Sequence, residues 1–172
     1  MRHIIAILLQ NEAGALARVA GLFSTRGYNI ESLSVAPTDD PTVSRLTLVS
    51  TGSDPIIAQI RNQLRKLVDV VQVEDLTRGE HFERELLLIK LRLNATQLEP
   101  LTALVTAAAG RILSGSLQNF VVELTSGEAQ VSRFIAQAAA YGEVLEVVRS
   151  GALGIAQGGA TVTQLAGSGA PA

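Results

Sequence analysis

The stretch IIAILLQNEAGALARV, residues 4–19, contains the two local patterns on which the fold depends. Residues 4–9 are apolar at every position, which is typical of a strand buried on both faces. Residues 11–26 then place Leu16, Val19 and Phe23 at helical spacing, which predicts an amphipathic helix. We expect Gly27 to end that helix in a left-handed conformation. A buried strand that runs into a helix is therefore the first part of the fold.

Further strands and a second helix are predicted through residue 76. Residues 29–36 and 43–50 are predicted strands, joined by a run rich in turn-forming residues at 37–41. Asp54 and Pro55 predict the start of a second helix, and a fourth strand follows at 68–76. The order strand, helix, strand, strand, helix, strand is the ferredoxin-like arrangement, in which two helices cover one face of a four-stranded antiparallel sheet.

The second half repeats this order. A polar interruption after Leu76 predicts a boundary, so the first domain spans 1–77 and the second spans 78–157. The predicted elements of the second domain are strands at 86–93, 111–113, 120–124 and 144–148, with helices at 96–109 and 128–140. Residues 158–172 are rich in Gly and Ala and predict a weakly structured tail. The expected fold class is α+β, with two tandem ferredoxin-like βαββαβ domains.

Helices on one face leave the other face of each sheet open. Residues 4–9 and the valine-rich run at 68–73 supply apolar side chains to both faces of the first sheet. An exposed apolar sheet face is a contact surface. We expect a second copy of the chain to cover it, because a two-fold interface is self-complementary. The alternative is that the two domains cover each other.

The composition restricts the function. The chain has 14 basic and 16 acidic residues, a balance that argues against a nucleic-acid partner. It has no cysteine, which excludes disulfides, thiolate catalysis and cysteine metal sites. His3 and His81 have no partner at metal-ligand spacing. No apolar run is long enough to span a membrane, and no secretory cleavage site follows the start. We therefore expect a cytoplasmic protein with no membrane partner.

Two stretches of the sequence, residues 11–19 and 27–33, suggest a binding site for a small amino acid. In the first, the backbone N–H groups of Gly14, Ala15 and Leu16 would receive a carboxylate at the start of a helix. The side-chain oxygen of Asn11 in the first stretch, or of Asn29 in the second, could accept a hydrogen bond from an ammonium group. Leu16 and Ile30 would form an apolar wall. The structural alternatives are a capping role for Asn11, a packing role for Gly14 and a turn at Asn29.

The pattern Asn11-x-x-Gly14-x-Leu16-x-Arg18-Val19 resembles the first loop and helix of ACT domains, the amino-acid-sensing modules of metabolic enzymes. The strings GLFSTRGYNIESL at 21–33 and VAPTDDP at 35–41 narrow the resemblance to the small, regulatory subunit of acetolactate synthase. In the second half, the strings EREL at 83–86 and VRSG at 148–151 are similar to the same family. The chain departs from many ACT domains in having Asn11 and Ala13 where they have Asp and Pro, and the stretch 94–110 is unusually rich in alanine.

The resemblance implies a non-catalytic regulatory subunit. Such a subunit binds the catalytic (large) subunit, raises its activity, and confers feedback inhibition by a branched-chain amino acid, usually valine. The thiamine diphosphate, magnesium and FAD belong to the catalytic subunit, so no cofactor is expected on this chain. The resemblance also implies a homodimer formed by ACT domains, with the effector held between Gly14 of one copy and Asn29 of the other.

Two other functions are compatible with parts of the sequence. One is a free-standing ACT-type regulator that responds to an amino acid, although no basic recognition helix for DNA is evident. The other is an enzyme on a ferredoxin-like scaffold, with Glu31, Asp39 and Asp40 as acid–base groups. These carboxylates lie in or beside a predicted turn, where solvated side chains are the simpler interpretation.

Overall fold

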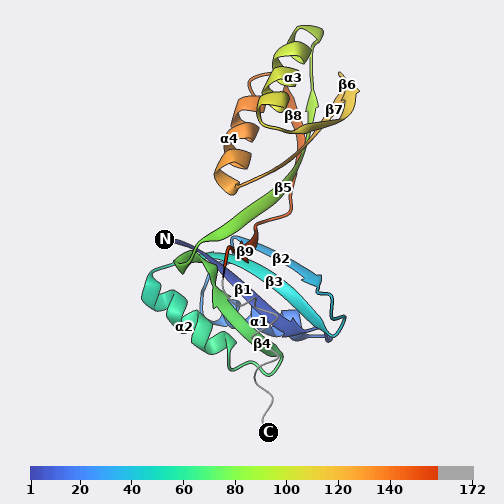
Figure 1. The fold of residues 1–172 in the computed structure, drawn as a ribbon. Coiled ribbons are helices and arrows are strands. Elements are labelled where there is room, and N and C mark those ends of the chain that lie inside the picture. The colour runs from blue at the N-terminus through green and yellow to red at the C-terminus, as the bar shows by residue number, and fades with distance from the viewer. Residues whose placement is uncertain (159–172) are drawn as a thin grey trace. The chain divides into compact units, whose positions relative to one another are not determined.

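The computed structural model describes residues 1–158, which form two compact units (Figure 1). The first unit contains residues 1–82 together with the segment that begins at Ala152. The second unit contains residues 83–151. The chain thus leaves the first unit once and returns to it. Residues 159–172, which include nearly all of the expected tail, lie outside the described part of the chain.

The first unit is a four-stranded sheet with two helices. Its elements are β1 (Arg2–Gln10), α1 (Ala15–Thr25), β2 (Ser32–Pro37), β3 (Val43–Thr51), α2 (Asp54–Leu64), β4 (Val70–Asp75) and the 3-10 turn η1 (Leu76–Arg78). The strand order is β2-β3-β1-β4, and β1 runs antiparallel to both β3 and β4. This order confirms the predicted βαββαβ arrangement.

The core of the first unit lies between the sheet and the two helices. Alternate residues of β1, among them Ile5 and Ile7, point to the helices. There they join a cluster with Val19 and Phe23 of α1 and Ile60 of α2. Gly27 has φ +68° and follows Arg26, the C-cap residue of α1, as expected for the residue that ends the helix.

The opposite face of the same sheet is also partly covered. Ile4, Ala6 and Val49 form a second cluster on this face with Leu76 and with Ala152, a residue of the returning segment. The short strand β9 (Leu153–Ala156) follows Ala152 and pairs with the long strand β5 (His81–Arg92).

Small residues allow β9 to lie close to the sheet. A Cβ atom added to Gly154 would lie 2.8 Å from a methyl group of Leu76 and 3.3 Å from one of Ile4. Polar contacts complete the attachment: Arg45 Nη2 donates to Gly154 O at 2.7 Å, and Ala152 N donates to Ser32 Oγ at 3.4 Å.

This arrangement differs from the sequence-based expectations in two respects. The predicted boundary after residue 77 lies within the first unit, and residues 152–157, which were assigned to the second domain, pack on the first sheet. The sequence also suggested a second copy or the second domain as the cover for this sheet face. In the structure, part of the cover is the segment 152–156, in which Ala152 and Ala156 pack on the sheet while Leu153 and Ile155 are exposed.

The second unit repeats the fold. After β5 come η2 (Ala95–Gln97), α3 (Leu98–Ala107), β6 (Arg111–Ser116), β7 (Asn119–Ser126), α4 (Glu128–Ala138) and β8 (Glu143–Arg149), with strand order β6-β7-β5-β8. Leu87, Ile89 and Leu91 of β5 pack against both helices. The predicted α+β class with two ferredoxin-like sheets is therefore confirmed.

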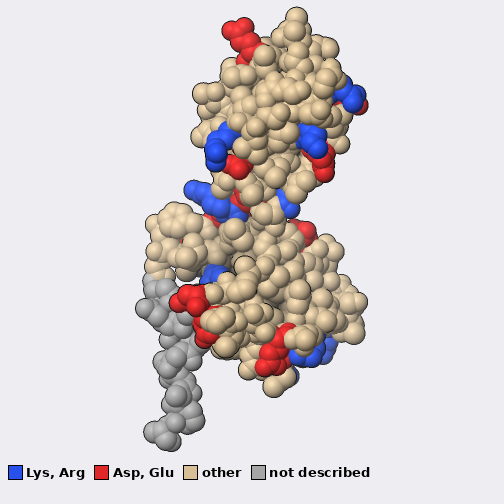
Figure 2. Space-filling model, turned by 90° about the vertical axis from the view of Figure 1, so that its right-hand side faces the viewer, with Lys and Arg blue, Asp and Glu red and all other residues tan. Residues whose placement is uncertain are grey.

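The second sheet differs from the first on the face away from its helices. Here the strands are linked by ion pairs: Lys90–Glu146 at 2.9 Å, Arg92–Glu143 at 2.6 Å and Arg111–Glu123 at 3.2 Å. On the molecular face drawn in Figure 2, positive and negative groups are interspersed among uncharged ones. The charges of this sheet are thus largely paired between strands.

Candidate functional site

The loop between β1 and α1 is held by its asparagine. The backbone N–H of Asn11 donates to Thr42 O at 2.7 Å, and its side-chain Nδ2 donates to Pro41 O at 2.9 Å. Asn11 therefore ties this loop to the turn between β2 and β3. Its side-chain oxygen is still an acceptor, as the proposed contact with an ammonium group requires.

Gly14 precedes α1 in a conformation that favours glycine. Its φ is +88°, and no side chain caps the helix start. The N–H of Ala15 donates to Glu12 O at 3.2 Å, so it is already used. The next two N–H groups, of Leu16 and Ala17, have no acceptor within the described residues, as is usual in the first turn of a helix. Free donors at this point suit a carboxylate.

The predicted residues in this run have different surroundings. Ala15 is buried in the core of the first unit, whereas the side chain of Leu16 is 38% exposed. The side chain of Leu16 is thus free to contact a ligand, whereas the side chain of Ala15 is buried and its N–H is already paired.

Sequence reasoning missed an ion pair beside this loop. Arg18 donates from Nε and Nη2 to both carboxylate oxygens of Asp69, with an Nη2–Oδ1 distance of 2.7 Å. The Asp69 side chain is only 5% exposed, and that of Arg18 is 47% exposed. Hydrogen bonds from Arg18 lower the pKa of Asp69 below its ordinary value, and the same bonds raise the pKa of Arg18. The two residues are 51 positions apart, so no local sequence pattern reveals the pair.

The other half of the expected site lies beyond the far end of α1. Asn29 O accepts from Ser50 Oγ at 2.7 Å, which fixes the backbone here, and Ile30 packs against the core. The 11-residue helix α1, about 16 Å long, separates Gly14 from Asn29. A single copy of the chain therefore does not bring the two halves of the predicted site together.

Two of the three carboxylates considered for acid–base chemistry, Asp40 and Glu31, accept hydrogen bonds from threonine residues. Asp40 accepts from Thr42 N at 2.9 Å and from Thr42 Oγ1 at 2.6 Å, and these bonds lower its pKa. Glu31 accepts from Thr51 Oγ1. Asp39 is solvent-exposed in the same turn as Asp40. A carboxylate that is stabilised in its charged form within a turn is a poor candidate for a general acid.

Residues 1–158 contain neither a metal-binding cluster nor a membrane-spanning helix. No group of three or more acidic, histidine or cysteine side chains there could hold a metal ion. None of the helices in this range has the length and apolar character needed to cross a bilayer.

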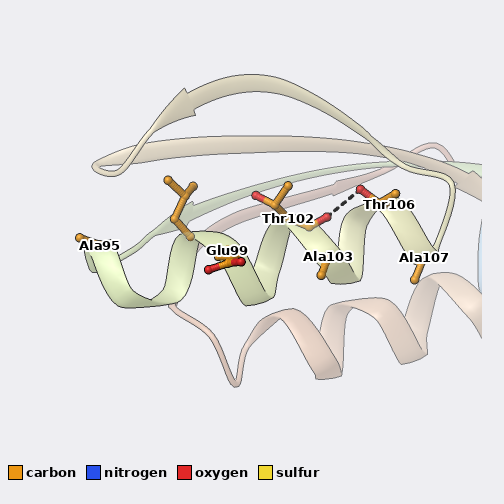
Figure 3. Close-up of a pocket in the computed structure, with 7 residues that line it drawn as sticks. Ala95, Glu99, Thr102, Ala103, Thr106 and Ala107 are labelled. Carbon is orange, nitrogen blue, oxygen red and sulfur yellow. Dashed lines mark hydrogen bonds between the residues drawn. The ribbon is translucent and has the colours of Figure 1, made fainter.

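Surface hollows also lie outside the predicted site. A groove of about 440 Å³ runs between β2 and β9, lined in part by Val35, Pro37, Arg45 and Leu153. A larger, shallow hollow of about 680 Å³ follows the outer face of α3, with Glu99 as its one charged group (Figure 3). The Thr106 hydroxyl in that hollow donates to Thr102 O of the same helix at 2.9 Å. The groove between β2 and β9 is also lined by Ser34, Thr38, Asp39 and Thr47, and neither hollow includes a residue of the predicted site.

Comparison with protein families identifies both halves of the chain. Residues 5–72 match the family described as the AHAS small subunit-like ACT domain. Residues 84–158 match the family described as the small subunit of acetolactate synthase. The loop before α1 with Gly14, and Arg18 of α1, lie within the first of these matches.

Individual proteins match over nearly the same range. The acetolactate synthase isozyme 3 small subunit of Escherichia coli is 42% identical over 158 residues, which are 92% of this chain and 97% of that protein. The acetolactate synthase small subunit of Haemophilus influenzae is also 42% identical, with the same coverage. The crystal structure of the small subunit from Thermotoga maritima is 32% identical and superposes with a TM-score of 0.82, covering 93% of this chain and 99% of that one.

Proposed function

Because the chain belongs to the family of acetolactate synthase small subunits, we propose that it regulates a catalytic large subunit of that enzyme. It raises the activity of the large subunit and makes it sensitive to a branched-chain amino acid, with valine as the best candidate. The chain itself is non-catalytic, and thiamine diphosphate, magnesium and FAD belong to the large subunit. The observation that carries the proposal is the start of α1 in the ACT domain. Gly14 precedes the helix there, and the N–H groups of Leu16 and Ala17 in its first turn are unpaired among the described residues.

The geometry of this helix start supports recognition of an amino acid zwitterion. The carboxylate accepts hydrogen bonds from Leu16 N and Ala17 N, close to the positive end of the helix dipole. Asn11 or Asn29 accepts from the ammonium group with its side-chain oxygen. Leu16 and Ile30 provide apolar surface for an aliphatic side chain, and a branched side chain suits such a wall.

We propose that the effector binds between two copies of the chain. The separation of Gly14 and Asn29 by the length of α1 supports this, because each copy then supplies one half of a site. The edge position of β2 in the sheet also supports it, since an edge strand offers backbone groups for pairing with a second copy. Ser32, the first residue of β2, lies only two positions after Ile30.

A ligand that bridges two copies can act at a distance. Binding favours the dimer geometry in which the half-sites fit together, and the large subunit responds to that geometry. Such coupling is typically about 1–3 kcal/mol, or about 5- to 150-fold. An effector sensed at sub-millimolar levels needs a binding free energy of only about −5 to −6 kcal/mol.

Reconstitution with a large subunit tests the proposal. Acetolactate production is measured with the large subunit alone, with the complex, and with the complex in rising valine, leucine or isoleucine. We expect the complex to be more active than the large subunit and one of the three amino acids to inhibit it. Equal activity with and without this chain would contradict the regulatory role, and activation without inhibition would contradict the effector site.

The free-standing regulator and the enzyme make different predictions in a purification experiment. A large thiamine-dependent protein that co-purifies with this chain supports the regulatory subunit. Association with DNA would support the free-standing regulator, and turnover by the isolated chain would support the enzyme.

A further inference from the structure

Asp69 is a buried carboxylate that the proposed effector site does not yet use. Its side chain is 5% exposed, and it lies in the connection between α2 and β4. Its backbone oxygen accepts from Gln10 N at 2.8 Å, directly before Asn11. A buried charge is costly unless it is paired, and here the partner is Arg18. The pair therefore joins the first turn of α1 to the connection between α2 and β4.

The ion pair fixes the direction of the Arg18 guanidinium. Nε and Nη2 face Asp69, which leaves Nη1 as the remaining nitrogen of the planar group. A Cβ atom added to Gly14 would lie 2.9 Å from Nη1 and 3.6 Å from Cζ. The guanidinium thus stands over Gly14, at the same end of α1 as the unpaired N–H groups of Leu16 and Ala17.

We propose that Arg18 is a further effector-binding residue, which recognises the α-carboxylate through Nη1, and that Asp69 is the positioning residue that holds it there. The inference rests on the effector site proposed above and adds the positively charged group that binds the effector carboxylate there. Charge-assisted hydrogen bonds are the stronger ones, and the helix start adds neutral N–H donors to the same anion. The site then requires a ligand with a free carboxylate, and it rejects the corresponding amide.

The charges around Arg18 make the proposal more specific. Asp69 and Glu12 are the acidic groups that act on it electrostatically. Asp69 occupies two nitrogens of the guanidinium, whereas Glu12 is solvent-exposed in the loop before α1. Removal of the Glu12 charge should therefore strengthen effector binding slightly, because one repulsive charge near the carboxylate disappears.

Calorimetry with two ligands tests the inference on the full-length chain. The ligands are L-valine and L-valinamide, which differ in the carboxylate. The parent chain should bind valine at least about tenfold more tightly than the amide. In Arg18→Gln, we expect valine affinity to fall about tenfold while amide affinity is unchanged. Asp69→Asn should weaken valine binding by a smaller factor, because the guanidinium is no longer held over Gly14.

Two controls separate this effect from general damage. Arg133→Gln removes an exposed arginine from α4 in the second unit and should leave both affinities unchanged. Arg18→Lys keeps the charge but cannot pair with Asp69 in the same two-pronged way, so it should lose valine affinity only partly. Arg18→Lys takes the place of Arg18→Gln if thermal unfolding shows that the latter does not fold.

The outcomes distinguish this inference from the proposed function. A parent chain that binds valine, combined with an unchanged valine-to-amide ratio in the Arg18 variant, would overturn the role of Arg18 alone. A parent chain that binds neither ligand nor any branched-chain amino acid would overturn the effector site and the role of Arg18 together.

Discussion

Gly14 is restricted by both its backbone and its neighbour. Its φ of +88° is unfavourable for residues with a side chain, and the space where a Cβ would lie is occupied by the Arg18 guanidinium. A side chain at this position must therefore displace Arg18, which would also disturb the partner of the buried Asp69. The glycine, the arginine and the aspartate depend on one another although only two of them are close in sequence.

The substitution Gly14→Asp should abolish feedback inhibition of the reconstituted enzyme. A carboxylate at this position would pair with Arg18 and occupy the place proposed for the effector carboxylate. We expect the valine concentration needed for inhibition to rise by about a hundredfold or more, because the variant loses the charge-assisted hydrogen bonds to the effector carboxylate. The matched control is Gly21→Asp on the same helix, where an added Cβ would meet no atom within 4 Å. Normal inhibition in Gly14→Asp would refute the site.

The Arg18–Asp69 pair should also contribute to the pH dependence of stability. The pKa of Asp69 is lowered in the folded state, chiefly by its hydrogen bonds with Arg18. The stabilisation is therefore complete above the unfolded-state pKa of about 3.9 and is lost as the pH falls through the lower folded-state value. Between neutral pH and about pH 3, the melting temperature of Asp69→Asn should fall less than that of the parent. Asp39→Asn, an exposed control in the first unit, should behave like the parent in thermal unfolding.

At the scale of single elements, β9 depends on close approach to the first sheet. The substitution Gly154→Val adds atoms where Leu76 and Ile4 already lie. We expect the free energy of unfolding to fall by about 1–3 kcal/mol, as is typical for overpacked sites. Ile155→Val on the same strand, at a side chain that is 58% exposed, should change it by less than about 0.5 kcal/mol. Urea unfolding followed by circular dichroism measures both, and equal effects would argue against the close packing of β9.

Strands β5 and β8 offer a matched comparison of two arginine–glutamate pairs. Glu85–Arg149 has a glutamate that is 4% exposed, whereas Arg92–Glu143 has one that is 62% exposed. Glu85→Gln should destabilise the second unit by about 1–3 kcal/mol, because a buried charged acceptor is lost. Glu143→Gln should cost less than about 0.5 kcal/mol. The same urea experiment tests this, and similar costs for the two variants would contradict the argument from burial.

The spacing of apolar residues predicted most helices and strands, because each of them buries one face, or in a strand such as β1 both faces. The apolar run at 4–9 became β1, and the helices expected from residues 11 and 128 are α1 and α4 with slightly different ends. Strand β5 begins earlier than the expected strand at 86–93, at His81 in the first unit, because backbone pairing extends through polar residues that the sequence pattern assigned to a boundary.

Features that depend on distant contacts could not be predicted. In the candidate site, the glycine and the loop asparagine were found from local sequence. Arg18 lies off the apolar stripe of α1, and only the fold shows its partner 51 residues away. The apolar character of residues 151–155 indicates a segment that packs against other structure but not where it packs, and only the fold shows Ala152 against the first sheet.

At the scale of the whole molecule, a bridging effector must favour the dimer. Each site is then formed by two half-sites from different copies. When the effector concentration is 100 times the effector's own dissociation constant, every bound effector strengthens association of the two copies by about 2.7 kcal/mol. The dimer dissociation constant should then fall by about a hundredfold for each effector bound. Sedimentation equilibrium with and without valine measures this, with Gly14→Asp as the variant that should not respond. An unchanged dissociation constant in the parent would show that the site lies within one copy.

The return of the chain to its first unit has a consequence for how the protein is made. The apolar cluster around Ile4 and Val49 needs Ala152, which is synthesised only after the 69 residues from Glu83 to Gly151. At about 5–20 residues per second, a ribosome needs roughly 3–14 s to reach it. During that interval the newly made first sheet presents an apolar face without this part of its cover. A nascent chain is therefore most open to premature association, or to a chaperone, while its second unit is still being translated.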